Sequence, residues 1–362
     1  MMKKLVTIFI LAISAPCIAQ TALNSLIPGT SEGVTYFLPD TKVGITVETC
    51  CITQTPGEFN SYAERFLHIK DVVSKANNRW EITGIESHTE GVPNKAKTFT
   101  VKLGSSTASN IRLDDKGIIC AINTGTQPKH PHGKDAGRRD ANIKNDATQY
   151  MTEEMLTATS TAKMAELTAK EIYAIRESKL AITRGQAENI PADGAGISLL
   201  LQELDKQEKA LTELFTGRTD TVYHTYSYSI APEEIHDTTK AVLFRFSQKL
   251  GVVEKENLAG EPVYYSIKNL KTVEIPVVVE DEKKKKGKKE KTPKQPEGIL
   301  YNIPGRAKME IYSRTTTFLE KEMTIAQFGT TEVLAKSLFS KDNTIKVLFD
   351  TATGGIISIK KD

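Results

Sequence analysis

Hydrophobic residues at three- and four-residue steps predict two amphipathic helices in the middle of the chain. The first is expected from about Thr161 to Thr183, a stretch rich in the helix formers Ala, Glu, Lys, Met and Leu. Gly185 suits a left-handed C-terminal cap, and Pro191 prevents simple continuation of the helix. The second helix is expected to end at Gly217, and its apolar face consists of Ile197, Leu200, Leu201, Leu204, Leu211, Leu214 and Phe215.

These two helices are expected to pack against each other as an antiparallel hairpin. The apolar stripe of the second helix needs a partner, because burial of such a stripe is what stabilises an amphipathic helix. The expected packing partner is the side of the first helix that carries Ile172, Ile175 and Ile182. The opposite face of the second helix is charged and should face water; it carries Glu203, Lys206, Glu208, Lys209 and Glu213.

Alternation of apolar and polar residues predicts strands on the N-terminal side of the hairpin. Phe59, Tyr62, Ala63 and Phe66 lie at helical spacing, so a short helix is expected over 58–67. Trp80, the single tryptophan, is interpreted as a core residue rather than a ligand platform. The expected strands are 34–38, 43–49, 80–86, 99–103 and 118–122, with a hairpin turn over 114–117.

A second β-rich region follows the hairpin and is similar in style to the first. A short helix is expected within 325–339, and Gly354-Gly355 marks a final turn. The expected strands are 221–230, 241–247, 263–267, 271–279, 298–303, 308–319, 344–349 and 356–359.

The elements together predict an α+β fold, with two β-rich domains flanking a central antiparallel helical hairpin. Residues 124–158 have little hydrophobic patterning and are expected to be a linker or long loop. His130 and His132 lie in this loop, but a metal site would need further ligands. The expected parts are a signal peptide (1–19), an N-terminal β-rich domain (20–123), the linker (124–158), the hairpin (159–217) and a C-terminal β-rich domain (218–362).

The N-terminus predicts export. Lys3 and Lys4 precede a short apolar run, and a small residue, Ala19, stands before Gln20. This pattern is typical of a secretory signal peptide, and the run is too short to span a membrane. Cleavage after Ala19 is favoured over lipidation of Cys17, because Pro16 occupies the position where a lipobox needs a small residue. The expected location is the periplasm or the periplasmic face of the outer membrane, with no transmembrane segment in the mature chain.

A lysine-rich insertion at 281–294 changes how the charge of the chain is interpreted. The insertion has eight lysines and three acidic residues, whereas the whole chain has a net charge of only +3. Such a run is normally a solvated loop tip. Its functional alternative is contact with an anionic lipid surface, since lysines near such a surface contribute about 1 kcal/mol each. Export argues against nucleic acid as the partner. The residues in contact with the lipid surface would be Lys283, Lys284, Lys285, Lys286, Lys288, Lys289 and Lys291.

The three cysteines of the expected mature chain leave two interpretations open. Cys50 and Cys51 are adjacent, so in a strand they would point to opposite faces. One of them could form a disulfide with Cys120, or all three could remain free thiols. No histidine or cysteine stands at metal-ligand spacing from them, so the sequence predicts no metal site here.

The sequence offers little catalytic chemistry. It has no nucleophile elbow, zinc-protease motif, phosphate loop, dinucleotide-binding motif or CxxC pair, and no cofactor is predicted. The histidines are widely dispersed. An enzyme would require a site assembled from distant positions.

Several segments are similar to the DUF4831 family, exported proteins of Bacteroides and related Bacteroidota. The resemblance covers nearly the whole expected mature chain. It implies export into a Gram-negative envelope, and it implies no activity and no functional residues. The segments that carry it are GVTYFLPDTKVGITVE, Pro56 to Val72, the strand around Trp80, Ile111 to Asn123, the helical hairpin, Ala326 to Phe339 and the closing TGGIISI.

The leading functional hypothesis is a non-catalytic interaction or assembly component that binds a protein partner in the envelope. Exposed edge strands and a projecting hairpin would be its contact surfaces. The alternative is a glycan- or peptidoglycan-binding module, and an enzyme comes third. A glycan module needs a solvent-facing aromatic platform, for which Tyr226 and Tyr228 share one strand face and Tyr223, Tyr264 and Tyr265 are further candidates.

Overall fold

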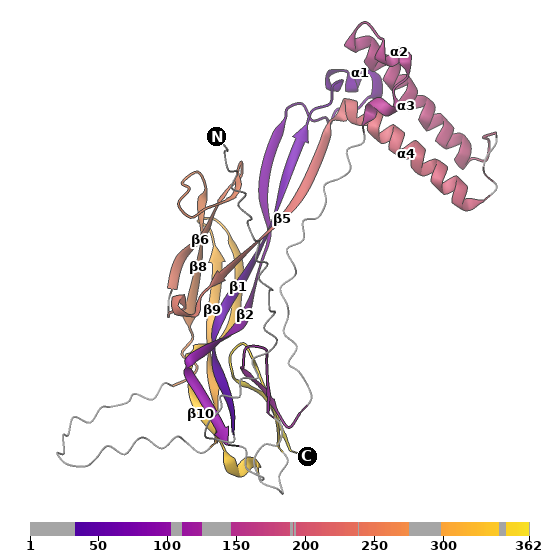
Figure 1. Ribbon diagram of the computed structural model, residues 1–362. Coiled ribbons are helices and arrows are strands. Elements are labelled where there is room, and N and C mark those ends of the chain that lie inside the picture. Colours follow the sequence, from indigo (N-terminus) through magenta and orange to yellow (C-terminus); the bar gives the residue numbers. More distant parts are fainter. Residues whose placement is uncertain are drawn as a thin grey trace, which may run out of the picture.

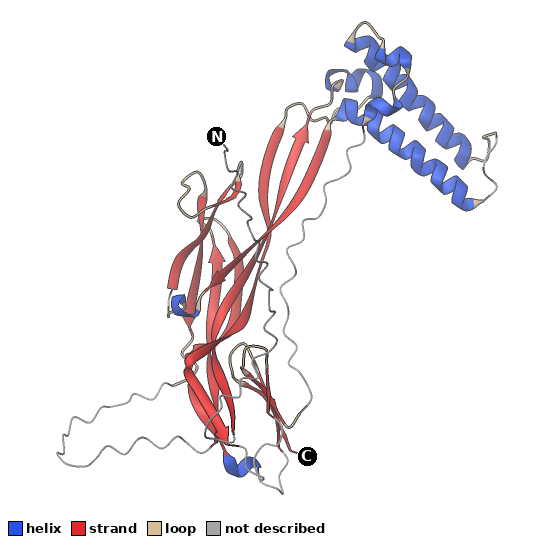
Figure 2. Ribbon diagram, viewed as in Figure 1, coloured by secondary structure: helices blue, strands red, loops and turns tan. Residues whose placement is uncertain are grey.

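The computed structural model shows an elongated molecule with a β-sheet body, a strand stalk and a helical head (Figure 1). It describes residues 33–102, 111–124, 146–188, 191, 193–237, 239–274, 298–339 and 345–361. Within them the strands form three antiparallel sheets (Figure 2). The predicted mixture of helices and antiparallel strands is therefore confirmed.

The first sheet has three strands in the order β2-β1-β5. They are β1 (Gly33–Thr55), β2 (Asn77–Lys102) and β5 (Arg218–Ile230). Two predicted strands, 34–38 and 43–49, are parts of the single strand β1, and 80–86 is part of β2. Pro39 lies at a register shift between β1 and β2, where a missing backbone N–H disturbs the ladder least, so the strand continues through it.

The second sheet has five strands in the order β10-β9-β8-β6-β7. The predicted strand 308–319 is instead a hairpin, in which the Ser313 N–H donates to the Thr316 carbonyl oxygen across 2.8 Å. The predicted short helix within 325–339 is limited to a 3-10 turn, η4 (Lys336–Phe339), because the preceding residues pair with β9. The strands are β6 (Thr239–Ser247), β7 (Gly251–Val253), β8 (Glu261–Asn269), β9 (Gly298–Tyr312) and β10 (Thr317–Ala335).

These two sheets pack face to face around the largest core of the body. Alternate residues of β1, Val43, Ile45 and Val47, are buried there against the five-stranded sheet. The opposing side chains include Ile267, Met309, Ile311 and Ile325. The period-two pattern that predicted these strands is thus the pattern that fills this core.

The third sheet joins the two β-rich regions of the sequence. Its order is β12-β11-β4-β3, with β3 (Ile111–Leu113), β4 (Ile119–Ile122), β11 (Ile345–Phe349) and β12 (Ile356–Lys361). The predicted turn at 114–117 joins β3 to β4, and the Asp114 carboxylate accepts from the Lys116 and Ile118 N–H groups. Because β4 pairs with β11 and β1 pairs with β5, the two β-rich regions do not form separate sheets. Alternation along a strand predicts which side chains face the core, but it does not predict which other strand pairs with it. The pairing between the two regions was therefore not predicted.

A buried polar cluster fastens the sheets together. The Asn302 amide nitrogen donates to the carbonyl oxygens of Pro39 and Thr353, at 3.0 and 2.8 Å. Asn302 is only 2% exposed. Nearby, the buried Thr41 hydroxyl donates to the Ala352 carbonyl at 3.1 Å and accepts from the Ala326 N–H at 3.0 Å. Strands β1 and β9 and the turn before β12 are thereby held in one arrangement.

The first long helix has the predicted bounds, and the second ends before Gly217 as predicted, whereas its start had not been predicted. Helix α3 spans Thr161–Thr183 and α4 spans Gly194–Thr216. After α3, the Gly185 N–H donates to the Ile182 carbonyl and the Gln186 N–H to the Ala181 carbonyl, with Gly185 at φ +66°. This is a Schellman cap. Figure 1 shows the helices side by side and antiparallel.

The helical head is the set of helices at the end of the three-stranded sheet. Besides α3 and α4 it contains η1 (Asn60–Tyr62), α1 (Ala63–Leu67), η2 (Ala147–Tyr150) and α2 (Glu153–Leu156). The last two fall within the predicted linker. The one remaining short turn, η3 (Pro232–Glu234), lies in the body. The head has its own core of Phe59, Ala63, Leu67, Ala165, Ala169, Ile172, Ile175, Leu211 and Phe215.

Several predicted features lie outside the described residues. They are the signal peptide with Cys17, most of the linker with His130 and His132, and the lysine-rich insertion at 281–294. Among the helices that the structure describes, none has the length and apolar character needed to span a bilayer.

Candidate functional site

The helical head stands on a strand stalk that extends beyond the body. The stalk is the upper part of the three-stranded sheet, residues 48–55, 77–84 and 218–225 (Figure 2). The head joins it through backbone hydrogen bonds as well as through the chain. The Phe59 N–H donates to the Leu214 carbonyl at 2.7 Å, and the Val73 N–H to the Thr216 carbonyl at 2.8 Å. The end of α4 is therefore bonded to both connections that enter and leave α1.

Gly217 sets the angle between the head and the stalk. It is the only residue between α4 and β5, at φ +75° and ψ −177°. This region of backbone conformation is essentially restricted to glycine. A Cβ atom at Gly217 would also lie 2.6 Å from the Thr55 carbonyl oxygen and 2.8 Å from the Val73 Cβ. The joint is consequently a fixed bend rather than a loose linker.

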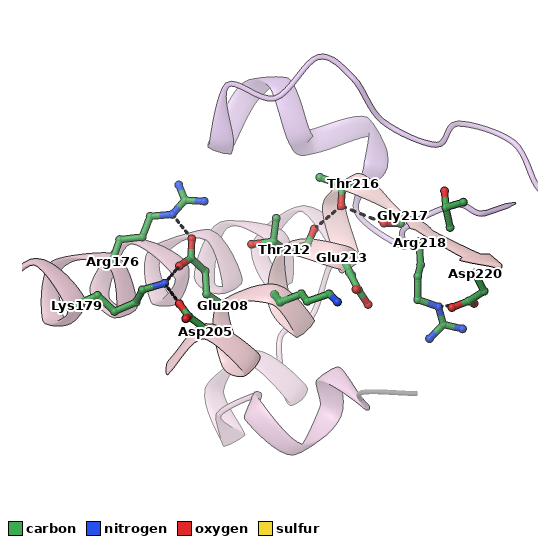
Figure 3. Close-up of a pocket in the computed structure, with 12 residues that line it drawn as sticks. Arg176, Lys179, Asp205, Glu208, Thr212, Glu213, Thr216, Gly217, Arg218 and Asp220 are labelled. Atoms are coloured by element: carbon green, nitrogen blue, oxygen red, sulfur yellow. Dashed lines mark hydrogen bonds and ion pairs between the residues drawn. The ribbon is translucent and has the colours of Figure 1, made fainter. Parts of the chain in front are cut away.

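A polar groove of about 530 Å³ lies where α3 and α4 meet the start of β5 (Figure 3). Helix α3 contributes Arg176 and Lys179, and β5 contributes Arg218, Thr219 and Asp220. The rest of the lining comes from α4 and Gly217. The α4 residues are Asp205, Glu208, Lys209, Thr212, Glu213 and Thr216.

Ion pairs between the two helices form one wall of the groove. Arg176 Nε lies 2.6 Å from Glu208 Oε1, and Lys179 Nζ lies 2.7 Å from Glu208 Oε2. Lys179 also pairs with Asp205. Burial by itself raises the pKa of the Glu208 carboxyl, but hydrogen bonds from Lys179 and Arg176 outweigh it, so the pKa is lowered. The pKa of Lys179 is raised by its hydrogen bonds to Asp205 and Glu208.

The chemistry of the groove is that of recognition by hydrogen bonds and ion pairs. Its lining has four basic and four acidic side chains, three threonines and one glycine. It holds no histidine or cysteine that could act as a base or nucleophile near neutral pH. Throughout the described part of the chain, no three His, Cys, Asp or Glu side chains are grouped so as to hold a metal ion.

The sequence predicted Glu208 and Lys209 as solvent-facing charges, but it did not indicate that Arg176 and Lys179 lie beside Glu208. Their pairing follows from the antiparallel register of α3 and α4. In an antiparallel helix pair, residue numbers rise along one helix as they fall along the other, so the numbers of facing residues add up to a constant. Opposite charges at positions with the same sum are the sequence signal that could have revealed these ion pairs. Arg176 with Glu208, and Lys179 with Asp205, share the same sum.

The distal half of the hairpin exposes leucines. The buried residues of α3 end at Ile175 and those of α4 begin at Ala210, so the described residues between them have none that is fully buried. Leu199 is 66% exposed, Leu180 49% and Leu200 38%. Figure 1 shows this end projecting away from the stalk and the body. The predicted apolar stripe of α4 is therefore fully buried only near the stalk; farther out, Ile197, Leu201 and Leu204 are half-buried and Leu200 is exposed.

Of the tyrosines predicted as a glycan platform, Tyr226 and Tyr228 pack against the body and Tyr265 is buried in its core, whereas Tyr223 is 43% exposed. Tyr226 and Tyr228 are half-buried beside the core between the two large sheets. The Tyr228 ring stacks on Phe244, with centroids 5.3 Å apart and planes 12° apart. Burial raises the pKa of Tyr228 to about 12. Neither ring is free to serve as a flat platform in this arrangement.

A different tyrosine pair faces away from the core. Tyr264 and Tyr312 are cross-strand neighbours with ring centroids 5.8 Å apart, and their strand neighbours Val263 and Ile311 are buried. The Lys240 ammonium lies over both rings, 5.3 and 5.8 Å from the centroids. The pair is thus covered by a lysine, as in ordinary cross-strand packing.

Trp80 is half-buried and outside the three main cores, contrary to the core prediction. The centroid of its ring lies 4.8 Å from the centroid of the His224 ring. It also covers Gly251 at the start of β7, where a Cβ atom would approach the indole to 2.7 Å. Trp80 is a packing contact between the stalk and the five-stranded sheet.

The structure has Cys50, Cys51 and Cys120 as free thiols, the second of the two interpretations. Phe37 forms a bridge with Ile118, close to Cys120, whereas Cys50 lies far along β1. At about 3.3 Å per residue, Cys50 is about 40 Å from Phe37. A disulfide needs Cα atoms within about 7 Å. Burial raises the pKa of Cys50, and it raises that of Cys120 to about 11.

Comparison with known proteins gives one result. The family model described as Domain of unknown function (DUF4831) matches residues 32–357. No curated protein and no solved structure matches the chain.

Proposed function

Because the chain belongs to the DUF4831 family, whose description states no activity, we propose from its geometry that it is a non-catalytic interaction protein. In this proposal the helical head binds a protein partner in the cell envelope. The single observation that carries it is the placement of the hairpin. A stalk with a fixed bend holds the head away from the body, and the distal leucines are exposed.

Physical reasoning favours contact through the distal half of the hairpin. Leu180, Leu199 and Leu200 lie in the distal half of the hairpin, over which none of the other described helices packs (Figure 1). Burial of a leucine stabilises by about 1.5–3 kcal/mol. These side chains are 38–66% exposed, so a partner that covers all three would gain about 2–5 kcal/mol in total.

The envelope location in this proposal is supported by the N-terminal sequence. Lys3 and Lys4 before an apolar run favour a secretory signal peptide and a periplasmic protein. The lysine-rich insertion supports an additional contact with an anionic lipid surface. Both supports come from sequence pattern, and they concern where the protein acts rather than what the head binds.

The test is capture from detergent-solubilised envelope with the mature chain as bait. A tip variant carries Leu180→Ser, Leu199→Ser and Leu200→Ser. A matched control carries Leu250→Ser and Leu258→Ser, two leucines of the body that are 55% and 81% exposed. We expect wild type and control to retain the same partner and the tip variant to lose about tenfold or more of it, since burial of the three leucines together contributes about 2 kcal/mol or more.

Unchanged folding of the tip variant is checked by circular dichroism and thermal unfolding. Exposed positions tolerate substitution to within about 0.5 kcal/mol, so both variants should unfold like the wild type. Equal recovery of the partner by the tip variant and the control, or no specific partner for the wild type, would contradict the proposal.

A further inference from the structure

We infer that the groove between the hairpin and β5 accepts an extended peptide segment of a partner protein, which pairs with β5 as a fourth strand. The inference rests on the proposed function and specifies the form of the partner. Two independent features meet at this place: an open sheet edge and a polar groove beside it.

The open edge belongs to β5. In the described part of the chain β5 pairs with β1 alone, because the sheet order is β2-β1-β5. Every second residue of such a strand directs its N–H and C=O away from the sheet. Along residues 218–223 this edge lies in the stalk and begins directly at the groove. Only another strand matches a row of donors and acceptors with this repeat.

The groove supplies a second wall for that strand. The hairpin leaves the stalk at an angle, so α4 and β5 form the two sides of a bend centred on Gly217 (Figure 1). Arg218, Thr219 and Asp220 line the groove from the strand side, opposite the ion-paired face of α3 and α4 (Figure 3). A peptide on the edge of β5 would therefore also contact the helices.

Some polar groups of the groove form no hydrogen bond or ion pair with the described residues and could bind such a ligand. Thr212 Oγ1 is buried and has no hydrogen-bond partner among the residues that the structure describes. Six of the eight charged lining residues are in ion pairs with each other. The other two, Lys209 and Glu213, form no ion pair with any described residue. A buried hydroxyl without a partner costs about 1–3 kcal/mol, which a bound polar group would recover.

The charge balance identifies the class of ligand. Four basic and four acidic residues line the groove, so it does not attract a polyanion such as nucleic acid. Small-molecule sites are mostly apolar and enclosed, and this groove is polar and open. A peptide strand provides backbone groups for the edge and mixed side chains for Lys209, Glu213 and Thr212.

Random dodecapeptides displayed on phage, panned against the mature chain (20–362), provide the probe. The most enriched peptide is synthesised with a fluorophore, and its Kd is measured by fluorescence anisotropy. The test variant is Lys209→Glu. The matched control is Lys206→Glu, the same charge change on the same helix, at a residue that pairs with Glu203 and does not line the groove.

We expect the peptide to slow amide hydrogen exchange in residues 218–223. We also expect Lys209→Glu to weaken binding about tenfold, as for the loss of one charge-assisted contact, and Lys206→Glu to leave the Kd unchanged. No enriched peptide, no slowed exchange in 218–223, or equal weakening by the two variants would overturn the inference. Because neither variant touches the distal leucines, failure here with loss of capture by the tip variant would leave the proposed function standing.

Discussion

Phe215→Ala is expected to lower the free energy of unfolding of the helical head by about 3–5 kcal/mol, the usual range for removing a buried phenylalanine ring. Phe215 is fully buried at the end of α4 and meets Phe59 edge-on, with ring centroids 5.4 Å apart. Its loss would leave a cavity where α4 joins the first connection from the stalk. The measurement is amide hydrogen exchange resolved by segment, together with chemical unfolding.

The location of the effect is as informative as its size. The head and the body have separate cores, so exchange should accelerate in 161–183 and 194–216 and change little in β8 and β9. Leu199→Ala is the control, because its side chain is 66% exposed and its truncation should change stability by no more than about 0.5 kcal/mol. Equal destabilisation of head and body would show that the head is not a separate core.

Asn302→Ala is expected to destabilise the body by about 2–6 kcal/mol. The Asn302 amide donates to the carbonyl oxygens of Pro39 and Thr353 in a fully buried setting. Its removal leaves both acceptors without that donor, and each unsatisfied buried group costs about 1–3 kcal/mol. Chemical unfolding monitored by tyrosine and tryptophan fluorescence measures the loss.

Asn257→Ala serves as the matched control for this substitution. Asn257 is exposed in a loop, and among the described residues its side chain accepts only from the nearby Ala259 N–H. Its loss should cost less than about 1 kcal/mol. If Asn302→Ala proved as mild as Asn257→Ala, the polar cluster would not be what fastens β1, β9 and the turn before β12.

The helices were predictable from sequence because their signals are local. Caps and breakers at Ser160, Gly185, Asp193 and Gly217 determine where α3 and α4 begin and end. Asp193 accepts from the Gly196 N–H at 2.7 Å, and Gly217 has a conformation suited to glycine. Such capping interactions depend on residues within a few positions of each other.

The sheets were predictable only as separate strands. Alternation correctly placed Val43, Ile45 and Val47 on a buried face, but nothing in β1 indicates that β5, more than 160 residues later, pairs with it. Strand pairing depends on side-chain fit over long sequence distances, and the strand period carries no partner information. The groove was missed for the same reason, since it forms only when α3, α4 and β5 come together.

The exposed end of the hairpin shows that the periodicity of a helix does not by itself determine how much of its apolar face the rest of the fold buries. Periodicity predicted an apolar stripe along the whole of α4, from Ile197 to Phe215. In the half near the stalk, Leu211 and Phe215 are fully buried against α3 and the short helices of the head. In the distal half no stripe residue is fully buried, and Leu200 is exposed. Leu199, which is still more exposed, lies beside the stripe. Apolar residues that are not buried within the molecule are the feature from which we propose that a partner protein buries them.

The most direct measurement is site-specific photo-crosslinking in cells that make the protein. A photoreactive phenylalanine analogue is placed at the position of Leu199 in the head or of Leu258 in the body, both highly exposed. We predict one discrete crosslinked protein product from the position of Leu199 and none of that product from the position of Leu258. No product from the head position, or the same product from both positions, would contradict the account that the helical head is the part that binds a partner.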